Sequence, residues 1–257
     1  MALMRLLVSV TSAAEASAAL AGGADVIDAK DPERGALGAV SPEAFREIRA
    51  AVARGRRETL MTAALGDADD EATIERDACA FTTAGAALVK VGFAGINDAG
   101  RVHALTAAAV RGAKAGNGGV VAVAYADAVL AASLAPGAVV AAAARAGAAG
   151  LLIDTAEKGV AGLRALVARR VLAAWVSEAQ AAGLIVALAG QLTADDLPFA
   201  RHAGADIAGV RGAACDGGRT GRVSADKVRI LRAVCESLNG PAEAVPQRKT
   251  QRIPGDL

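Results

Sequence analysis

The stretch RAGAAGLLID, residues 145–154, contains a unit that recurs along the chain. A helical segment ends in Ala-Gly, one or two small residues follow, and a short apolar run completes the unit. Glycine suits the left-handed turn that ends many helices, and the apolar run has the length and composition of a buried strand. The same arrangement occurs in LAGGADVID (20–28), TAGAALVKV (83–91), AAGLIVALAG (181–190) and HAGADIAGV (202–210).

Three further segments with strand character lie between these units: LLVSV (6–10), ETLMTAAL (58–65) and GVVAVAYAD (119–127). A helix-compatible segment follows each of the eight strands. The first helix, expected over residues 11–21, has Thr11 or Ser12 as its N-cap, with Glu15 placed as in a capping box. The second, over residues 41–53, has Ser41 as its N-cap. Later helices are expected to begin near Asp70, Asn97, Pro136, Gly162, Thr193 and Ser224.

Eight alternating strands and helices in a chain of 257 residues predict an α/β fold, the TIM (β/α)8 barrel, as a single domain over residues 1–238. An open doubly wound sheet is the alternative. The last segment, residues 239–257, is polar and holds three prolines, so a flexible tail is expected there.

The composition favours a soluble protein of the cytoplasm. Hydrophobic residues make up 54% of the chain and aromatic residues 2%, so the core is expected to consist of Ala, Val, Leu and Ile. No apolar run reaches the roughly 18 residues that span a membrane, and the first residues lack a signal-peptide cleavage pattern. A net charge of +1 without a long charged run gives no nucleic-acid footprint. The alanine-rich exterior is compatible with a homo-oligomer.

Cysteine and histidine give no sign of a metal site or of histidine-based catalysis. Cys79, Cys215 and Cys235 are far apart and lack CxxC spacing, so buried or incidental thiols are expected. His103 and His202 both fall in helical segments and are interpreted as structural. A zinc site on these cysteines is therefore not expected.

Lysine is scarce, and its positions are informative. Of the 28 basic residues only six are lysines: Lys30, Lys90, Lys114, Lys158, Lys227 and Lys249. Unlike arginine, lysine can lose its proton and attack a carbonyl carbon. The positions of the lysines are therefore candidates for catalytic residues.

Three of the six lysines are predicted to meet at one end of the barrel. Alternate residues of a strand share a face, so in ADVIDAKDPERG (24–35) Asp28 and Lys30 point the same way, into the barrel. Lys90 does so in its own strand, and Asp154 ends a strand with Lys158 four residues later. These five residues converge on the C-terminal mouth, where TIM-barrel active sites are built.

A structural interpretation of these charges is the alternative, with Asp28 and Lys30 as an ion pair that closes the barrel. Burying three amines among few carboxylates is costly unless their altered pKa values are used. Partly desolvated lysines have lowered pKa values and serve as nucleophiles or acid–base groups near neutral pH. We therefore expect the cluster to be catalytic.

Two small-residue loops are candidates for binding phosphate: ALAGQL (187–192) and GVRGAACDGGRTG (209–221). In TIM barrels the loops after the seventh and eighth strands commonly bind phosphate through backbone N–H groups. Gly190, Gly212 and Arg211 are the candidate residues. The alternative is that these glycines only make tight turns.

With these blocks in view, the chain resembles the (5-formylfuran-3-yl)methyl phosphate synthase family over roughly residues 5–237. The resemblance rests on LLVSV, GGADVIDAKDPERGALGA, LVKVGFAG, LLIDTAEKG and GVRGAAC. It implies a TIM-barrel lyase that joins two molecules of glyceraldehyde 3-phosphate, a triose phosphate, into a furan phosphate with loss of phosphate and water. That reaction serves methanofuran-type cofactors in one-carbon metabolism.

The resemblance also implies roles for the five residues of the cluster, none of which departs from the family pattern. A lysine forms a Schiff base with a triose phosphate, and the derived enamine attacks the second aldehyde. Lys30 is the favoured nucleophile, with Asp28 shuttling protons. Lys158 and Asp154 supply acid–base catalysis, and Lys90 stabilises anions or holds phosphate. An exchange of roles between Lys30 and Lys158 stays open. This scheme requires neither a metal nor an organic cofactor.

Two rival interpretations remain. Sugar-phosphate synthases or decarboxylases of the orotidine-decarboxylase type carry D-x-K-x-x-D at a strand end and often use magnesium; Asp28 and Lys30 match its start, but position 33 is Glu. Alternatively, a non-catalytic barrel binds triose phosphate without turnover.

Overall fold

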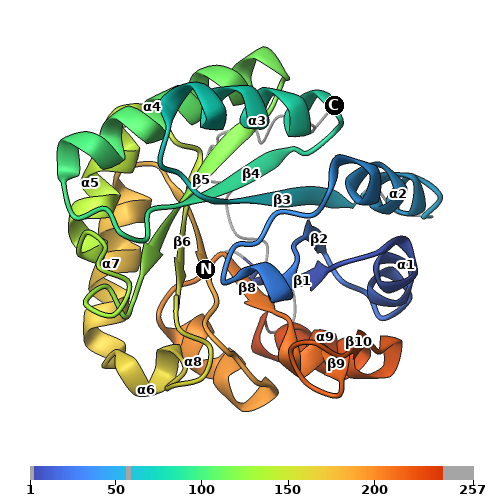
Figure 1. The fold of residues 1–257 in the computed structure, drawn as a ribbon. Helices are drawn as coiled ribbons and strands as arrows, with labels where there is room; N and C mark the ends of the chain where they lie inside the picture. The colour runs from blue at the N-terminus through green and yellow to red at the C-terminus, as the bar shows by residue number, and fades with distance from the viewer. Residues whose placement is uncertain (1–2, 56–58, 240–257) are drawn as a thin grey trace.

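The chain folds into a closed barrel of parallel strands surrounded by helices (Figure 1). The computed structural model describes residues 3–55 and 59–239. Strand β1 pairs with both β2 and β8, which closes the sheet. This closure confirms the predicted TIM barrel and excludes the open doubly wound sheet. The strands are β1 (Arg5–Val10), β2 (Val26–Ala29), β3 (Leu60–Asp67), β4 (Leu88–Gly92), β5 (Gly119–Tyr125), β6 (Gly150–Asp154), β7 (Ile185–Leu188) and β8 (Ile207–Val210).

The helices lie between the strands and cover the outside of the barrel. They are α1 (Ala13–Ala21), α2 (Pro42–Ala53), α3 (Glu71–Thr83), α4 (Ala99–Ala115), α5 (Pro136–Ala146), α6 (Leu163–Leu166), α7 (Arg169–Ala181), α8 (Leu197–His202) and α9 (Ala225–Asn239). Ser12, Ser41 and Asp70 cap their helices by accepting backbone hydrogen bonds, as their sequences indicate. A helix begins after Gly162, as predicted, but it is the short α6, and the longer α7 begins at Arg169.

The barrel strands bury apolar side chains on both faces, as parallel strands do. The outward set, such as Val89 and Val91, packs against the helices in the main core. Inside the barrel, Leu7, Val26 and Ile207 form the floor. Above these three residues, polar or charged side chains take inward positions on β1 to β4: Ser9, Asp28, Thr62 and Lys90.

One side of the barrel mouth is filled by side chains. Leu37, from the segment between β2 and α2, is buried inside the barrel together with Tyr125 and Val123 of β5. A Cβ on Gly92 would lie within 2.5 Å of both Leu37 and the Tyr125 hydroxyl, so glycine is required at the end of β4. The Tyr125 hydroxyl donates a hydrogen bond to Asp67 (2.6 Å). The open part of the mouth therefore lies toward the other strands.

The segment after β8 adds a 3-10 turn, η3 (Gly212–Ala214), and a two-stranded ribbon of β9 (Cys215–Asp216) and β10 (Arg222–Val223). The last described residue, Asn239, ends α9 rather than starting a tail, and residues 240–257 of the predicted tail lie outside the described residues, as does residue 58 of the predicted third strand. No helix in the described part of the chain has the length and apolar character needed to cross a membrane.

Candidate active site

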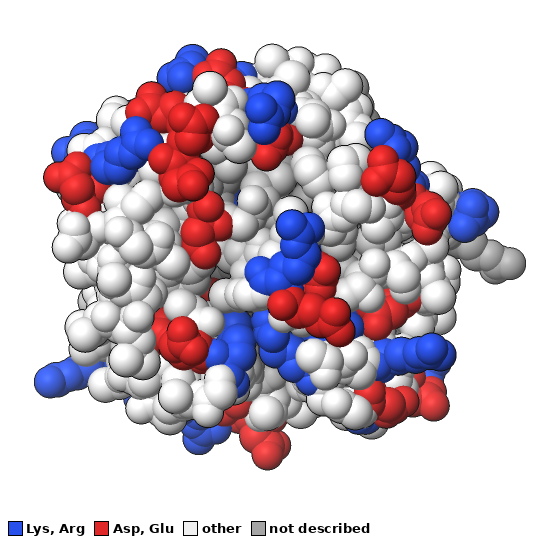
Figure 2. Space-filling view, viewed as in Figure 1, with Lys and Arg blue, Asp and Glu red and all other residues white. Residues whose placement is uncertain are grey.

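The predicted residues come together around a cavity of about 300 Å³ at the C-terminal mouth of the barrel. Small-molecule sites begin near this volume. Charged groups of both signs surround the hollow near the centre of this face (Figure 2). The cavity is lined by Lys30, Lys90, Asp154, Lys158, Gly190, Arg211 and Gly212, each of which the sequence selects. Asp28 lies directly against Lys90 in the barrel interior.

Asp28 is fully buried and saturated with hydrogen bonds. The hydroxyls of Ser9 and Thr62 donate to it at 2.8 and 2.7 Å, and the Lys90 ammonium lies 2.5 Å away. Burial opposes its ionisation, but Lys90 and then Lys30 hold the pKa of the Asp28 carboxyl below its ordinary value. Its ion-pair partner is thus Lys90, and the alternative of a structural Asp28–Lys30 pair is wrong.

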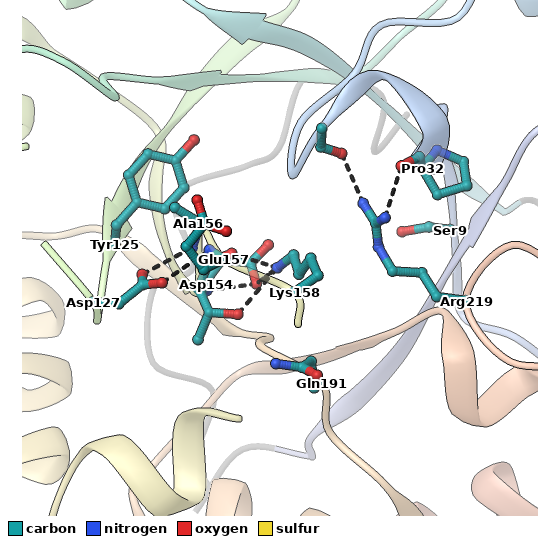
Figure 3. Close-up of polar contacts among 12 residues, drawn as sticks. Ser9, Pro32, Tyr125, Asp127, Asp154, Ala156, Glu157, Lys158, Gln191 and Arg219 are labelled. Atoms are coloured by element: carbon teal, nitrogen blue, oxygen red, sulfur yellow. Dashed lines mark hydrogen bonds and ion pairs between the residues drawn. The ribbon is translucent and has the colours of Figure 1, made fainter. Parts of the chain in front are cut away.

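Asp154 and Lys158 form the second pair. The Lys158 ammonium donates to Oδ1 of Asp154 at 2.7 Å and also contacts the carbonyl of Thr155 (Figure 3). The other carboxylate oxygen, Oδ2, is buried and has no hydrogen-bond partner among the described residues. Burial opposes ionisation here too, yet Lys158 and Lys30 keep the pKa of Asp154 low. A buried carboxylate oxygen without a donor beside a cavity is available to a ligand.

Lys30 differs from the other two lysines. It is 8% exposed and lines the cavity, but in the described residues no hydrogen bond or ion pair involves its ammonium. Burial lowers the pKa of Lys30 to about 8, with Asp154 acting against burial and Lys90 adding to it. A substantial fraction of Lys30 is therefore an uncharged amine at mildly alkaline pH.

Arg211, a predicted phosphate ligand, is occupied by structural contacts. Its guanidinium binds both oxygens of Glu15, at 2.5 and 3.1 Å, and donates to the carbonyls of Ser9, Arg219 and Gly221. These contacts use all five of its N–H groups. In this arrangement Arg211 has no donor left for a phosphate, because Glu15 and the three carbonyls occupy all of its N–H groups.

The glycine loops contribute Gly190, Gln191 and Gly212 to the lining of the cavity. Gly190 has a φ of +98°, and a Cβ there would lie 3.0 Å from the side chains of Leu163 and Thr155, so the position requires glycine. Gln191 follows with a φ of +58°, an unusual conformation for a residue with a side chain. The N–H groups of Gly190, Gln191 and Gly212 have no acceptor among the described residues. Such donors suit an anion.

Sequence reasoning missed two side chains at this site. Arg219 lines the cavity from the segment after β8. Asp127 follows β5 and accepts the backbone N–H groups of Ala156 and Glu157, at 2.8 and 2.9 Å, just before Lys158 (Figure 3). A carboxylate at the end of the predicted strand 119–127 was the available signal for Asp127. No group of three or more possible metal ligands occurs in the described residues.

The sequence is similar to those of known proteins over most of its length. The sequence model of the 4-HFC-P synthase family matches residues 6–232. The (5-formylfuran-3-yl)methyl phosphate synthase of Methanocaldococcus jannaschii is 37% identical, covering 91% of this chain and 100% of the relative. That of Methanopyrus kandleri is 36% identical, covering 91% and 98%.

Solved structures that resemble this fold include a 3-hexulose-6-phosphate synthase and the orotidine 5'-phosphate decarboxylase of Pyrococcus horikoshii. The first has a TM-score of 0.63 at 22% identity, covering 90% of this chain and 99% of that chain. The second has a TM-score of 0.60 at 15% identity, covering 92% and 100%. At these identities the similarity establishes the fold alone.

Proposed function

The chain belongs to the 4-HFC-P synthase family, and from this membership and the site we propose that it condenses two molecules of glyceraldehyde 3-phosphate into (5-formylfuran-3-yl)methyl phosphate. Phosphate and water leave, so the enzyme is a carbon–oxygen lyase. The product would serve the biosynthesis of a methanofuran-type cofactor. The observation that carries the proposal is a buried lysine of the cavity, Lys30, which has a pKa of about 8 and no ion pair within the described residues. A carboxylate oxygen of Asp154 in the same cavity lining also has no donor among the described residues.

Lys30 is the proposed nucleophile. Its uncharged amine attacks the carbonyl carbon of a triose phosphate and, after loss of water, forms an imine. Lys90 and Lys158 are each held in an ion pair with a buried carboxylate, whereas no carboxylate binds Lys30 in the described residues. This difference favours Lys30 over Lys158 as the nucleophile, a choice that the sequence alone leaves open.

Asp154 is the proposed proton acceptor. Asp154 lines the cavity, and one of its carboxylate oxygens has no donor among the described residues. Among the carboxylates, Asp154 has the strongest electrostatic effect on Lys30. Removing a proton from the imine gives the enamine that attacks the second aldehyde. We therefore assign proton transfer to Asp154 instead of Asp28. Both oxygens of Asp28 already accept hydrogen bonds, from Ser9, Thr62 and Lys90.

The remaining groups stabilise charge. Lys158, bound to Asp154, is placed to protonate leaving oxygens during the eliminations. Lys90, fixed by Asp28, supplies positive charge for anionic intermediates. The backbone N–H groups of Gly190 and Gly212 are the proposed ligands for a substrate phosphate.

The orotidine-decarboxylase-like alternative gains no support from this site. Its motif needs a second acidic residue near position 33, and Glu33 is exposed on the turn η1 (Pro32–Arg34), outside the lining of the cavity. Activity lost to EDTA and restored by magnesium would favour that alternative.

The test is purified protein with glyceraldehyde 3-phosphate as sole substrate, following phosphate release and the ultraviolet absorbance of a furan aldehyde. Both signals should rise together, and borohydride should trap the substrate on the peptide that carries Lys30. Lys30→Arg keeps the charge but cannot form the imine, so turnover should be abolished. Lys114→Arg, an exposed change on α4, is the matched control and should stay active. A fully active Lys30→Arg enzyme would refute the nucleophile assignment.

A further inference from the structure

Arg219 reaches across the mouth of the barrel from the segment after β8. Its Nη1 donates to the carbonyl of Pro32 and its Nη2 to the carbonyl of Gly35, both at 2.7 Å (Figure 3). These two carbonyls belong to the segment that directly follows Lys30. The guanidinium therefore lies between two loops at the edge of the cavity, close to the proposed nucleophile.

The backbone of Arg219 is held in place from inside the barrel. Arg211, paired with Glu15, donates to the carbonyl of Arg219 at 3.0 Å and to that of Gly221 at 2.9 Å. The Glu15–Arg211 pair is buried, so it fixes the segment that presents Arg219. Arg211, which the sequence predicts as a phosphate ligand, thus holds the backbone of Arg219 in place.

The two arginines differ in their unused donors. Arg211 uses five N–H groups, whereas the contacts of Arg219 within the described residues use two. Because a guanidinium has five N–H groups in a planar fork, three remain on Arg219. A planar fork of this kind matches the oxygens of a phosphate.

The charges of the site leave Arg219 without a carboxylate partner. Three cations of the cavity are each bound to a buried carboxylate: Lys90 to Asp28, Lys158 to Asp154 and Arg211 to Glu15. Of the described side chains that line the cavity, the two cations outside such pairs are Lys30 and Arg219. Lys30 is assigned to the imine, so Arg219 is the cation that remains for a dianionic group.

We propose that Arg219 binds the phosphate group of a substrate triose phosphate through its remaining N–H groups, at a subsite beside Lys30. The same guanidinium holds residues 32–35, so a bound phosphate and this segment share one anchor. The identity of the substrate rests on the proposed function, whereas the phosphate-binding role rests on the contacts of Arg219. Two substrate molecules bring two phosphates, and this subsite is separate from the backbone donors of Gly190.

The first arm of the test measures binding of inorganic phosphate by calorimetry, without turnover. Arg219→Gln should weaken binding about 10-fold to 100-fold, as expected for hydrogen bonds to a charged group. Arg222→Gln, an exposed arginine of the same segment, is the matched control and should bind phosphate like the parent. Arg219→Lys keeps the charge without the fork and should fall between the two. Circular dichroism establishes that each variant is folded.

The second arm compares borohydride trapping on Lys30 with glyceraldehyde 3-phosphate and with unphosphorylated glyceraldehyde. Arg219→Gln should slow trapping of the phosphorylated aldehyde and leave that of glyceraldehyde unchanged. Equal losses for both aldehydes, or phosphate binding no weaker than in Arg222→Gln, would show that Arg219 only fastens the loops. If the parent binds phosphate through Arg219 but makes no furan product, the proposed function fails and this inference stands.

Discussion

At the scale of single residues, the site depends on how each buried charge is compensated. Asp28 and Asp154 each bind a lysine, but Lys30 is buried with no ion pair to any described residue. Taking an ammonium out of water is costly unless a partner compensates. The charged form of Lys30 therefore destabilises the fold, at a position where catalysis needs the uncharged amine. Such a conflict between activity and stability is common.

Replacing Lys30 by methionine should stabilise the fold at pH 7. The folded protein releases the Lys30 proton near pH 8 and the unfolded chain near 10.5, a difference of about 3 kcal/mol in free energy of unfolding. Between these values the unfolded chain binds more protons, so the stability of the parent rises with pH. The advantage of Lys30→Met should be full below about pH 8 and disappear toward pH 10.5. Urea unfolding at pH 7 and pH 10 measures it; a less stable variant at pH 7 would contradict the account.

At the scale of elements, the loop after β6 is held in place by the loop after the preceding strand, β5. Lys158 lies in the loop after β6, and its neighbours Ala156 and Glu157 donate their N–H groups to Asp127, which follows β5. Asp127 is 6% exposed and binds one N–H with each oxygen. The position of Lys158 near Asp154 thus depends on a carboxylate from the neighbouring β5 loop.

Asp127→Asn should lower kcat about 10-fold to 100-fold while the fold persists. An amide nitrogen would face one of the two N–H groups, so the loop must shift, and displacements near 1 Å cost rates of this order. Steady-state assays of furan formation measure the effect. Asp206→Asn is the control, because Asp206 also accepts a backbone N–H, from Val186 (2.8 Å), at the opposite end of the barrel. Equal kcat values for both variants would refute a positioning role for Asp127.

At the scale of the whole molecule, stability and function lie at opposite ends of the barrel. The cavity occupies the C-terminal mouth, whereas the last helix, α9, ends next to the start of β1, at the N-terminal end. There the Asn239 side chain accepts from the Met4 N–H (2.8 Å) and donates to the Met4 carbonyl (3.2 Å). The first strand and the last helix are thereby joined, at a point remote from the reacting groups.

Asn239→Ala should lower the free energy of unfolding by about 1 to 3 kcal/mol, because both Met4 groups lose a partner. The value of kcat should not change, since the cavity is at the other end. Ser237→Ala, in the same turn of α9, removes an exposed hydroxyl and should leave both quantities unchanged. Denaturant unfolding and the furan assay measure them; a large loss of kcat without destabilisation would contradict this separation.

The local pattern of the chain determines the fold and the set of inward side chains. Each Ala-Gly transition and apolar run specifies a helix end and a strand, and strand alternation directs Asp28, Lys30 and Lys90 into the barrel. These are properties of neighbouring residues, with periods of two or about four. That is why the barrel and the five clustered residues could be predicted without coordinates.

Only the tertiary structure decides which of these groups touch. Asp28 binds Lys90, two strands away, because the register of β2, β3 and β4 and the length of the lysine side chain bring them together. Arg211 turns to Glu15 of α1, and Arg219 crosses the mouth to residues 32–35, contacts between segments about 190 positions apart. The spacing of residues along the chain does not predict these contacts, because they form only when the sheet closes and brings its loops together.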